Sequence, residues 1–355
     1  MKVFVFIAMF FLAGCGAPNP IGNSPVPSPT NPTGPTVSYS GWGIQSSNAG
    51  ESVNKLSAVS VSLTNKTKSV TRIKHDRSSR GVMVGTNGTI ISISANGKTL
   101  VEMNPPSSGS LRDAEVRGSK TWVIGKDPTG GESIWVSSNN GTTWTKELNT
   151  SEYYFAGDNT DSSLDRLTGV VSVSDSEVLV SGSLRDGFQI LLRRDLAGAW
   201  SDVFIDPAIT VTKLTSIAKT DIDSFVVTGN NGLVAVSFDA GATWSSTQLQ
   251  TDTDVAKVSC SDLVCVVCGD GGLLYISSDA GSTWEASLSK PTVGDISAVS
   301  VVTTETAYRV YVGDSSGNLF YSEDLGVSWV SQGRKSTLPI ADIFMITDHS
   351  GWASG

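Results

Sequence analysis

Short apolar runs that alternate with glycine-rich turns recur along the chain after residue 40. Five runs are long enough for one strand each: residues 56–63, 167–173, 214–218, 296–302 and 340–346. Glycine frames four turns between further apolar runs: residues 85–88, 229–232, 269–272 and 313–317. Such turns are typical of β-hairpins, and no run after the first residues has helical spacing. The pattern predicts an all-β protein without helices, whose innermost strands are these five runs and their equivalents.

A short motif closes several of these hairpins. Four segments, at residues 137–144, 237–244, 277–284 and 322–329, obey the pattern S-x-[DN]-x-G-x-[ST]-W. A fifth, at residues 46–53, lacks only the Trp, and residues 95–100 and 195–200 look like degenerate copies, which makes seven. We expect structural roles in these turns for Asn48, Gly50, Asn139, Gly141, Trp144, Trp200, Asp239, Gly241, Trp244, Asp279, Gly281, Trp284, Asp324, Gly326 and Trp329.

Each position of the motif has a physical reason. Asp or Asn hydrogen-bonds the backbone of its own turn, Gly supplies the positive φ of the hairpin, and Trp buries a large ring beneath it. Successive copies are roughly 40 to 56 residues apart, about the length of a four-stranded propeller blade. The repeat therefore predicts a seven-bladed β-propeller with four-stranded antiparallel blades. Residues 351–355 and 41–44 match complementary strands of one last blade, so both termini are expected to close it.

This motif resembles that of the BNR or Asp-box repeat proteins, and among them the photosystem II assembly factor-like propellers. Their blades carry G-x-x-G followed by S-x-D-G-G-x-T-W, and the resemblance covers about residues 41–355. The resemblance implies the propeller fold. The wider Asp-box group also includes sialidases, sortilin-type receptors and xyloglucan-active hydrolases, so it does not decide the activity.

The first residues read as a targeting segment. Lys2 precedes an apolar run at residues 3–11 that is too short for a membrane-spanning helix, and the following Leu-Ala-Gly-Cys resembles the bacterial lipobox. The resemblance implies that Cys15 becomes the first mature residue and carries the lipid. We expect residues 1–14 to be a lipoprotein signal peptide, residues 15–38 a Pro-rich tether, and residues 39–355 the propeller. Gly16 after the lipidated residue favours the outer membrane or cell surface.

The overall charge excludes one class of partner. The chain has 25 Lys and Arg against 34 Asp and Glu, a formal net charge of −9. Proteins that bind nucleic acid depend on clustered Lys and Arg, so no nucleic-acid partner is expected. We expect the protein to be a monomer and to need no cofactor.

Three cysteines remain after Cys15, at positions 260, 265 and 268. Cys260 and Cys265 flank a short turn, and export to an oxidising compartment favours a disulfide between them, although all three could be small buried side chains. Neither His75 nor His349 is near them in sequence, so no metal site is predicted.

Two functions are compatible with the fold. A non-enzymatic scaffold that binds a protein or glycan is the first, and a sialidase-like glycoside hydrolase is the alternative. The chain lacks the Arg-Ile-Pro type motif that sialidases carry near their start. Its arginines do not lie in a recognisable sialidase motif; they include Arg72, Arg112, Arg117, Arg166 and Arg309. A pocket with clustered arginines and paired carboxylates would favour hydrolysis, and a broad surface would favour binding. We predict no catalytic residues.

The long connector at residues 151–166 is the candidate binding segment. It combines aromatic side chains with acidic ones, which suits a protein or glycan contact, although a locally packed surface loop would have the same composition. The candidate residues are Tyr153, Tyr154, Phe155, Asp158, Asp161 and Arg166. A second segment, at residues 66–80, is unusually basic and could meet an anionic lipid or polysaccharide, but a solvated hairpin is the commoner explanation of such a run.

Overall fold

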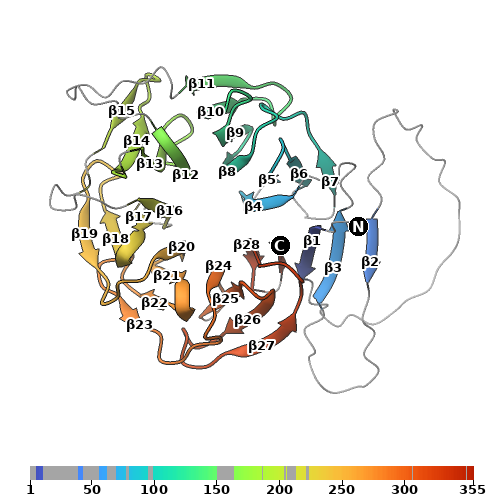
Figure 1. Cartoon of the computed structure of the whole chain (residues 1–355), viewed down its shortest axis with the longest axis vertical. Coiled ribbons are helices and arrows are strands. Elements are labelled where there is room, and N and C mark those ends of the chain that lie inside the picture. Colours follow the sequence, from blue (N-terminus) through green and yellow to red (C-terminus); the bar gives the residue numbers. More distant parts are fainter. Residues whose placement is uncertain are drawn as a thin grey trace, which may run out of the picture.

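The chain folds into a ring of antiparallel sheets around a central channel (Figure 1). This computed structural model describes residues 5–10, 39–42, 56–61, 69–76, 80–94, 99–149, 164–185, 187–203, 205, 213–220, 224–305, 307–348 and 350–355. The described residues contain strands and two single 3-10 turns, η1 (Asn230–Gly232) and η2 (Asp270–Gly272), so the all-β prediction is confirmed. Within that part of the chain we find no helix long and apolar enough to cross a membrane.

Six sheets are four-stranded blades, each with its strands in chain order from the channel outward. The first three are β4 (Val70–His75), β5 (Arg80–Gly85), β6 (Ile90–Ser94) and β7 (Leu100–Glu102); β8 (Leu111–Arg117), β9 (Lys120–Lys126), β10 (Glu132–Ser137) and β11 (Thr145–Asn149); and β12 (Leu164–Ser172), β13 (Val178–Leu184), β14 (Gln189–Arg194) and β15 (Trp200–Asp202). The next three are β16 (Leu214–Lys219), β17 (Phe225–Gly229), β18 (Leu233–Ser237) and β19 (Ser245–Gln248); β20 (Val255–Ser261), β21 (Val264–Gly269), β22 (Leu274–Ser277) and β23 (Glu285–Ala286); and β24 (Ile296–Thr303), β25 (Tyr308–Asp314), β26 (Asn318–Ser322) and β27 (Val330–Arg334).

The remaining strands form a five-stranded sheet, which corrects the predicted blade count. Its order is β2-β3-β1-β29-β28, with bounds β1 (Val5–Phe10), β2 (Tyr39–Trp42), β3 (Leu56–Val61), β28 (Asp342–Thr347) and β29 (Ser350–Ser354). The strand beside β29 is β1, whereas the sequence predicted the segment at residues 41–44 in that place. The structure thus has six four-stranded blades instead of seven, and the predicted closure of a four-stranded blade by both termini is not shown. Strand pairing depends on long-range contacts that a local repeat does not encode.

Hydrogen bonds from side chains join the innermost strand of one sheet to that of the next. Asp113 on β8 accepts the Val170 N–H of β12 at 3.0 Å, and Ser259 on β20 accepts the Val301 N–H of β24 at 3.0 Å. Between the last and the first of these strands, Asp342 on β28 accepts the Ile73 N–H of β4 at 2.8 Å. The strands that line the channel are therefore held side by side as a continuous ring.

The hydrophobic core lies between neighbouring sheets and is divided into separate clusters. One cluster joins Leu179 and Leu191 of the third blade to Phe225, Leu233 and Trp244 of the fourth. The second strands β5, β17 and β21 of their blades are fully buried, because both faces of each sheet pack against a neighbour. The interlocked packing gives the channel a rigid wall.

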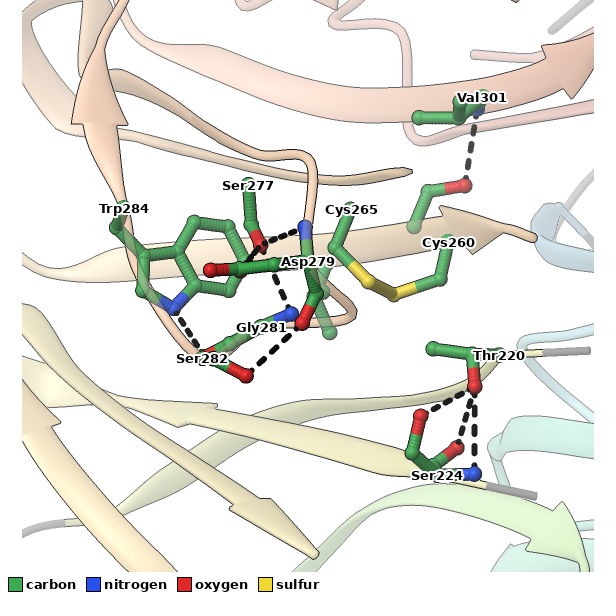
Figure 2. Close-up of a disulfide and its surroundings, with 12 residues drawn as sticks. Thr220, Ser224, Cys260, Cys265, Ser277, Asp279, Gly281, Ser282, Trp284 and Val301 are labelled. Atoms are coloured by element: carbon green, nitrogen blue, oxygen red, sulfur yellow. Dashed lines mark hydrogen bonds between the residues drawn. A yellow bond between two sulfur atoms is a disulfide. The ribbon is translucent and has the colours of Figure 1, made fainter. Parts of the chain in front are cut away.

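The turns between the third and fourth strands are the predicted motif, which we call the Asp-box turns. In the fifth blade Ser277 Oγ donates to Asp279 Oδ1 (2.7 Å) and accepts the Gly281 N–H (2.8 Å) (Figure 2). Thr283 donates its N–H to Asp279 Oδ1 at 2.9 Å. Trp284 Nε1 donates to the Gly281 carbonyl at 2.9 Å. Gly281 has φ +95°. The side-chain network replaces backbone partners that a tight turn cannot provide.

The residue before the motif glycine also lies in the left-handed region, which the sequence analysis did not anticipate. Its φ is +58° at Asn140, +57° at Ala240, +58° at Ala280 and +51° at Leu325. Asn tolerates this conformation better than Ala or Leu. Three of the four turns therefore hold Ala or Leu under mild backbone strain.

Candidate functional site

A cavity of about 670 Å³ lies at the end of the channel where the innermost strands begin. Cationic side chains from five of these strands or their leading residues line it: Arg72, Arg112, Arg166, Lys213 and Lys257. Asp165 is the one carboxylate in its described lining. We call this cavity the basic mouth. In a chain of net charge −9, this concentration of positive charge marks the mouth as a distinct surface.

Glu132 on β10 holds the rim of the basic mouth in place. Its carboxylate takes a two-point contact from Arg112, with Nη2 at 2.7 Å from Oε1 and Nε at 3.2 Å from Oε2. The same carboxylate accepts the backbone N–H of Leu167 at 3.1 Å. Glu132 is 2% exposed, so these contacts are made by a buried carboxylate that lies beneath the rim. One buried acid thus orients Arg112 and the strand that carries Arg166.

Arg166 is an exposed cation of this rim. Within the described structure its guanidinium makes no hydrogen bond or ion pair closer than 4 Å. Burial, and after it the positive charge of Arg112, lowers the pKa of Arg166. The neighbouring Lys213 Nζ lies 3.6 Å from Asp165 Oδ2, and both of these side chains are about half exposed. An anionic group placed here would relieve the repulsion between the two arginines.

The floor of the basic mouth is a buried network of charges. Arg72 lies between two carboxylates, with Nε 3.3 Å from Asp113 Oδ1 and Nη1 3.4 Å from Asp342 Oδ1. Burial alone would lower the pKa of Arg72, but the two carboxylates outweigh it and raise that pKa. Lys257 Nζ lies 3.8 Å from Asp342 Oδ1; burial and then Arg72 lower the pKa of Lys257 to about 8. The network lies between the two ends of the channel, and its charges compensate one another.

One of the candidate binding residues lies at this mouth. Arg166 lines the cavity, whereas Tyr153, Tyr154, Phe155, Asp158 and Asp161 are outside the described residues, as are Cys15, Asn48 and Gly50. Sequence reasoning missed Arg112, Lys213 and Lys257 as parts of a site. They share one signal, because each lies within two residues of the start of an innermost strand. Aligning the blades would have placed them at one end of the channel.

The basic segment at residues 66–80 is only partly described, and its described residues do not form a solvated face. Arg72, His75 and Arg80 are each less than one tenth exposed. Arg80 donates to the carbonyls of Gly118 and Lys120 at 3.1 Å and so ties the first blade to the second. The positive charges of Arg72 and Arg80 stabilise the ring from inside, because their partners come from neighbouring sheets.

The cysteines lie in the fifth blade. Cys260 on β20 and Cys265 on β21 are disulfide-bonded, with Cα atoms 4.1 Å apart, and Figure 2 shows the bond beside the Asp-box turn of the same blade. Cys268 is a buried thiol, and burial raises its pKa to about 12. Among the described residues no three His, Cys, Asp or Glu side chains are grouped as a metal site would require.

The basic mouth does not have the make-up of a glycosidase site. It has clustered arginines, but its described lining contains a single carboxylate, Asp165, and no tyrosine. A pair of carboxylates or an equivalent nucleophile is what such hydrolysis requires. The mouth is therefore suited to bind an anionic group.

Together, the ring of four-stranded antiparallel blades and the Asp-box turns define a β-propeller. The resemblance to the photosystem II assembly factor-like propellers is confirmed, since residues 193–343 match the family model described as photosynthesis system II assembly factor YCF48. A search of curated proteins finds no match to the sequence.

Solved structures with a similar fold include two of YCF48. A structure of YCF48 bound to a D1 peptide has TM-score 0.55 and 12% identity, and the alignment covers 81% of this chain and 91% of the other. YCF48 from Cyanidioschyzon merolae has TM-score 0.56 and 13% identity, with coverage of 81% and 95%. The WD40 repeats of RRP9 have TM-score 0.55 and 12% identity, with coverage of 82% and 96%. At this level of identity the likeness concerns the fold.

Proposed function

We propose that this propeller is a non-enzymatic scaffold that binds an acidic segment of a partner protein at its basic mouth. The observation that carries the proposal is the position of Arg166, which is exposed, has no carboxylate within ion-pair distance among the described residues and lies beside a second arginine. A carboxylate from a partner would accept hydrogen bonds from Arg166 and would neutralise the crowded positive charge. The similar propeller YCF48 has been solved with a D1 peptide bound, which supports a peptide or protein as the partner.

The cations of the basic mouth are already held in position before a partner binds, which favours binding. Glu132 fixes Arg112, and the Arg72 network fixes the floor, so the cations lose little freedom when a partner binds. The interaction is expected to weaken steeply with salt, because Arg166 and Lys213 are exposed charges.

The experiment that tests this function uses a fluorescently labelled peptide of about ten residues rich in Glu and Asp, with a Lys-rich peptide of the same length as control. We expect the propeller to bind the acidic peptide alone, and the variant Arg166→Glu/Lys213→Glu to bind it at least about tenfold more weakly. The matched control is Arg117→Glu, because Arg117 lies at the opposite end of the channel and pairs with Asp175 at 2.7 Å. Equal binding by the Arg166 variant and the native protein would refute the proposal.

We also propose that the mature protein is a monomer attached to the cell envelope by a lipid on Cys15. The lipobox and the Pro-rich tether support this, and the anchored form would lack β1, since Val5–Phe10 precedes Cys15. Mass spectrometry of the protein from membranes should show an N-terminal diacylated Cys15, and Cys15→Ala should release the protein from the membrane fraction. A native chain that begins at Met1 would disprove the anchor.

A further inference from the structure

A second cavity of about 520 Å³ opens at the opposite end of the channel, where the innermost strands finish. The Arg72 network separates it from the basic mouth, and Arg72 lines both. Its charged lining is balanced: the cations are Arg72, Lys74, Arg117 and Lys219, and the carboxylates are Asp76, Asp113, Glu115 and Asp342. We call it the balanced cavity. A ligand with a net charge would leave one charge uncompensated there, so the balance favours a neutral one.

One side of the balanced cavity presents hydrogen-bond donors. Ser216, Ser259 and Ser300 come from the consecutive strands β16, β20 and β24 and line the cavity. Each hydroxyl oxygen already accepts a backbone N–H of the next innermost strand, from Val258 (3.4 Å), Val301 (3.0 Å) and Met345 (3.0 Å) in turn. None of the three hydroxyl hydrogens has an acceptor among the described residues. The three serines can therefore donate to a ligand without losing the bonds that hold the ring.

The other side presents an unused acceptor. Asp113 on β8 gives its Oδ2 to the Val170 N–H at 3.0 Å, while its Oδ1 lies 3.3 Å from Arg72 Nε and makes no hydrogen bond in the described structure. The side chain is 2% exposed and lines the same cavity. Because Oδ1 is held by the ion pair with Arg72 and makes no hydrogen bond, it can still accept one from a ligand hydroxyl.

These groups together specify the chemistry of the ligand. It must accept from hydroxyls on one side, donate to a carboxylate on the other and carry no net charge. The half-buried ring of Phe344 also lines the cavity and adds an apolar surface of the kind against which the C–H face of a sugar ring packs. We propose that the balanced cavity is a binding site for a neutral saccharide. Its volume is within the usual range for small-molecule sites.

The test measures binding of D-glucose, D-galactose and D-mannose to the full chain by ligand-observed NMR and by changes in backbone amide signals. We expect at least one of these sugars to bind and to shift the amides of Val301 and Met345, which donate to the lining serines, while the amide of Leu167 at the basic mouth stays unchanged. Glucuronate and glucosamine, which carry a charge, should bind more weakly than the neutral sugars. Tighter binding of either charged sugar, or no binding of any neutral one, would overturn the proposal.

A variant distinguishes the site from general surface effects. Ser259→Ala/Ser300→Ala should weaken the binding of the best sugar by about tenfold or more. Ser297→Ala is the matched control on β24, because Ser297 donates to the Ile340 carbonyl at 2.7 Å and does not line the cavity. If the double variant does not fold, the amide shifts of the native protein decide alone. Because the two cavities are at opposite ends, Arg166→Glu/Lys213→Glu should leave sugar binding unchanged.

Discussion

Arg72 on β4 and Asp342 on β28 are 270 residues apart in the chain, yet their side chains lie 3.4 Å from each other at the channel wall. The other oxygen of Asp342 accepts the Ile73 N–H at 2.8 Å. One carboxylate thus joins the last innermost strand to the first, both through an ion pair and through the backbone.

Asp342→Ala is expected to destabilise the fold by about 3–5 kcal/mol, because it leaves Arg72 buried with one partner fewer and the Ile73 N–H without an acceptor. Asp342→Asn keeps an acceptor and should cost less. Chemical denaturation of Asp342→Asn, Arg72→Met and Arg72→Met/Asp342→Asn gives the coupling between the two side chains. An unfolding midpoint of Asp342→Ala equal to that of the native protein would show that the link between these strands contributes no stability.

Trp244→Ala is expected to cost about 3–5 kcal/mol, because the ring is 9% exposed and packs in the core between the third and fourth blades. The matched variant Trp284→Ala should cost less, since that ring is only half-buried and lies at the edge of its cluster. Thermal melts of the two variants provide the comparison. If Trp284→Ala were the less stable of the two variants, the Trp rings would stabilise the fold chiefly through their turns and little through core packing.

Gly241→Ala tests the conformation of an Asp-box turn. Gly241 has φ +81°, and a Cβ there would lie 2.6 Å from Leu179 Cδ1, so we expect a loss of about 2–3 kcal/mol from strain and overlap together. Gly118 has φ +56° with nothing within 4 Å of a Cβ, so Gly118→Ala should lose only about 1 kcal/mol. Denaturant midpoints of both variants measure the difference. Equal losses of stability in the two variants would show that the contact with Leu179 adds nothing to the cost of the positive φ.

Acid should loosen three of the Asp-box turns. Hydrogen bonds from the Thr243 side chain and then its backbone lower the pKa of Asp239 to about 2. Hydrogen bonds from Ser328 lower the pKa of Asp324 in the same way. At Asp279 burial opposes the hydrogen bonds from Thr283, but the bonds outweigh it and the pKa is lowered. A carboxyl whose folded pKa is depressed stabilises fully above its unfolded pKa, and this contribution disappears as the pH falls toward about 2. Melting temperatures between neutral pH and pH 2 should therefore fall less for Asp239→Asn/Asp279→Asn/Asp324→Asn than for the native chain.

A parallel acid dependence of this triple variant and the native protein would contradict that assignment. The turn at residues 137–144 is an internal reference, because it already carries Asn139, which accepts the Thr143 N–H at 2.9 Å without a titrating group. Its amide signals should be insensitive to acid over the range in which those of the other three turns change.

The local features of this fold could be predicted from sequence. The Asp-box turns, the glycine-framed hairpins and the apolar strands each depend on residues a few positions apart, because turn geometry and strand alternation are local properties. Hence the strands near residues 167–173, 214–218 and 296–302, and the hairpin turns between them, lie where the sequence pattern placed them.

Only the tertiary structure decided how many equivalent blades form and what the channel contains. The partner of β29 is selected from several strands of similar apolar pattern, and in the structure it is β1. Arg72, Lys257 and Asp342 lie close together because strands distant in the chain surround one axis. The sequence of a single repeat cannot predict that proximity. Sequence alone therefore determined the turns and strands, which depend on short-range sterics and hydrogen bonding. The charge network and both cavities depend on long-range packing, which brings side chains together regardless of their separation in sequence.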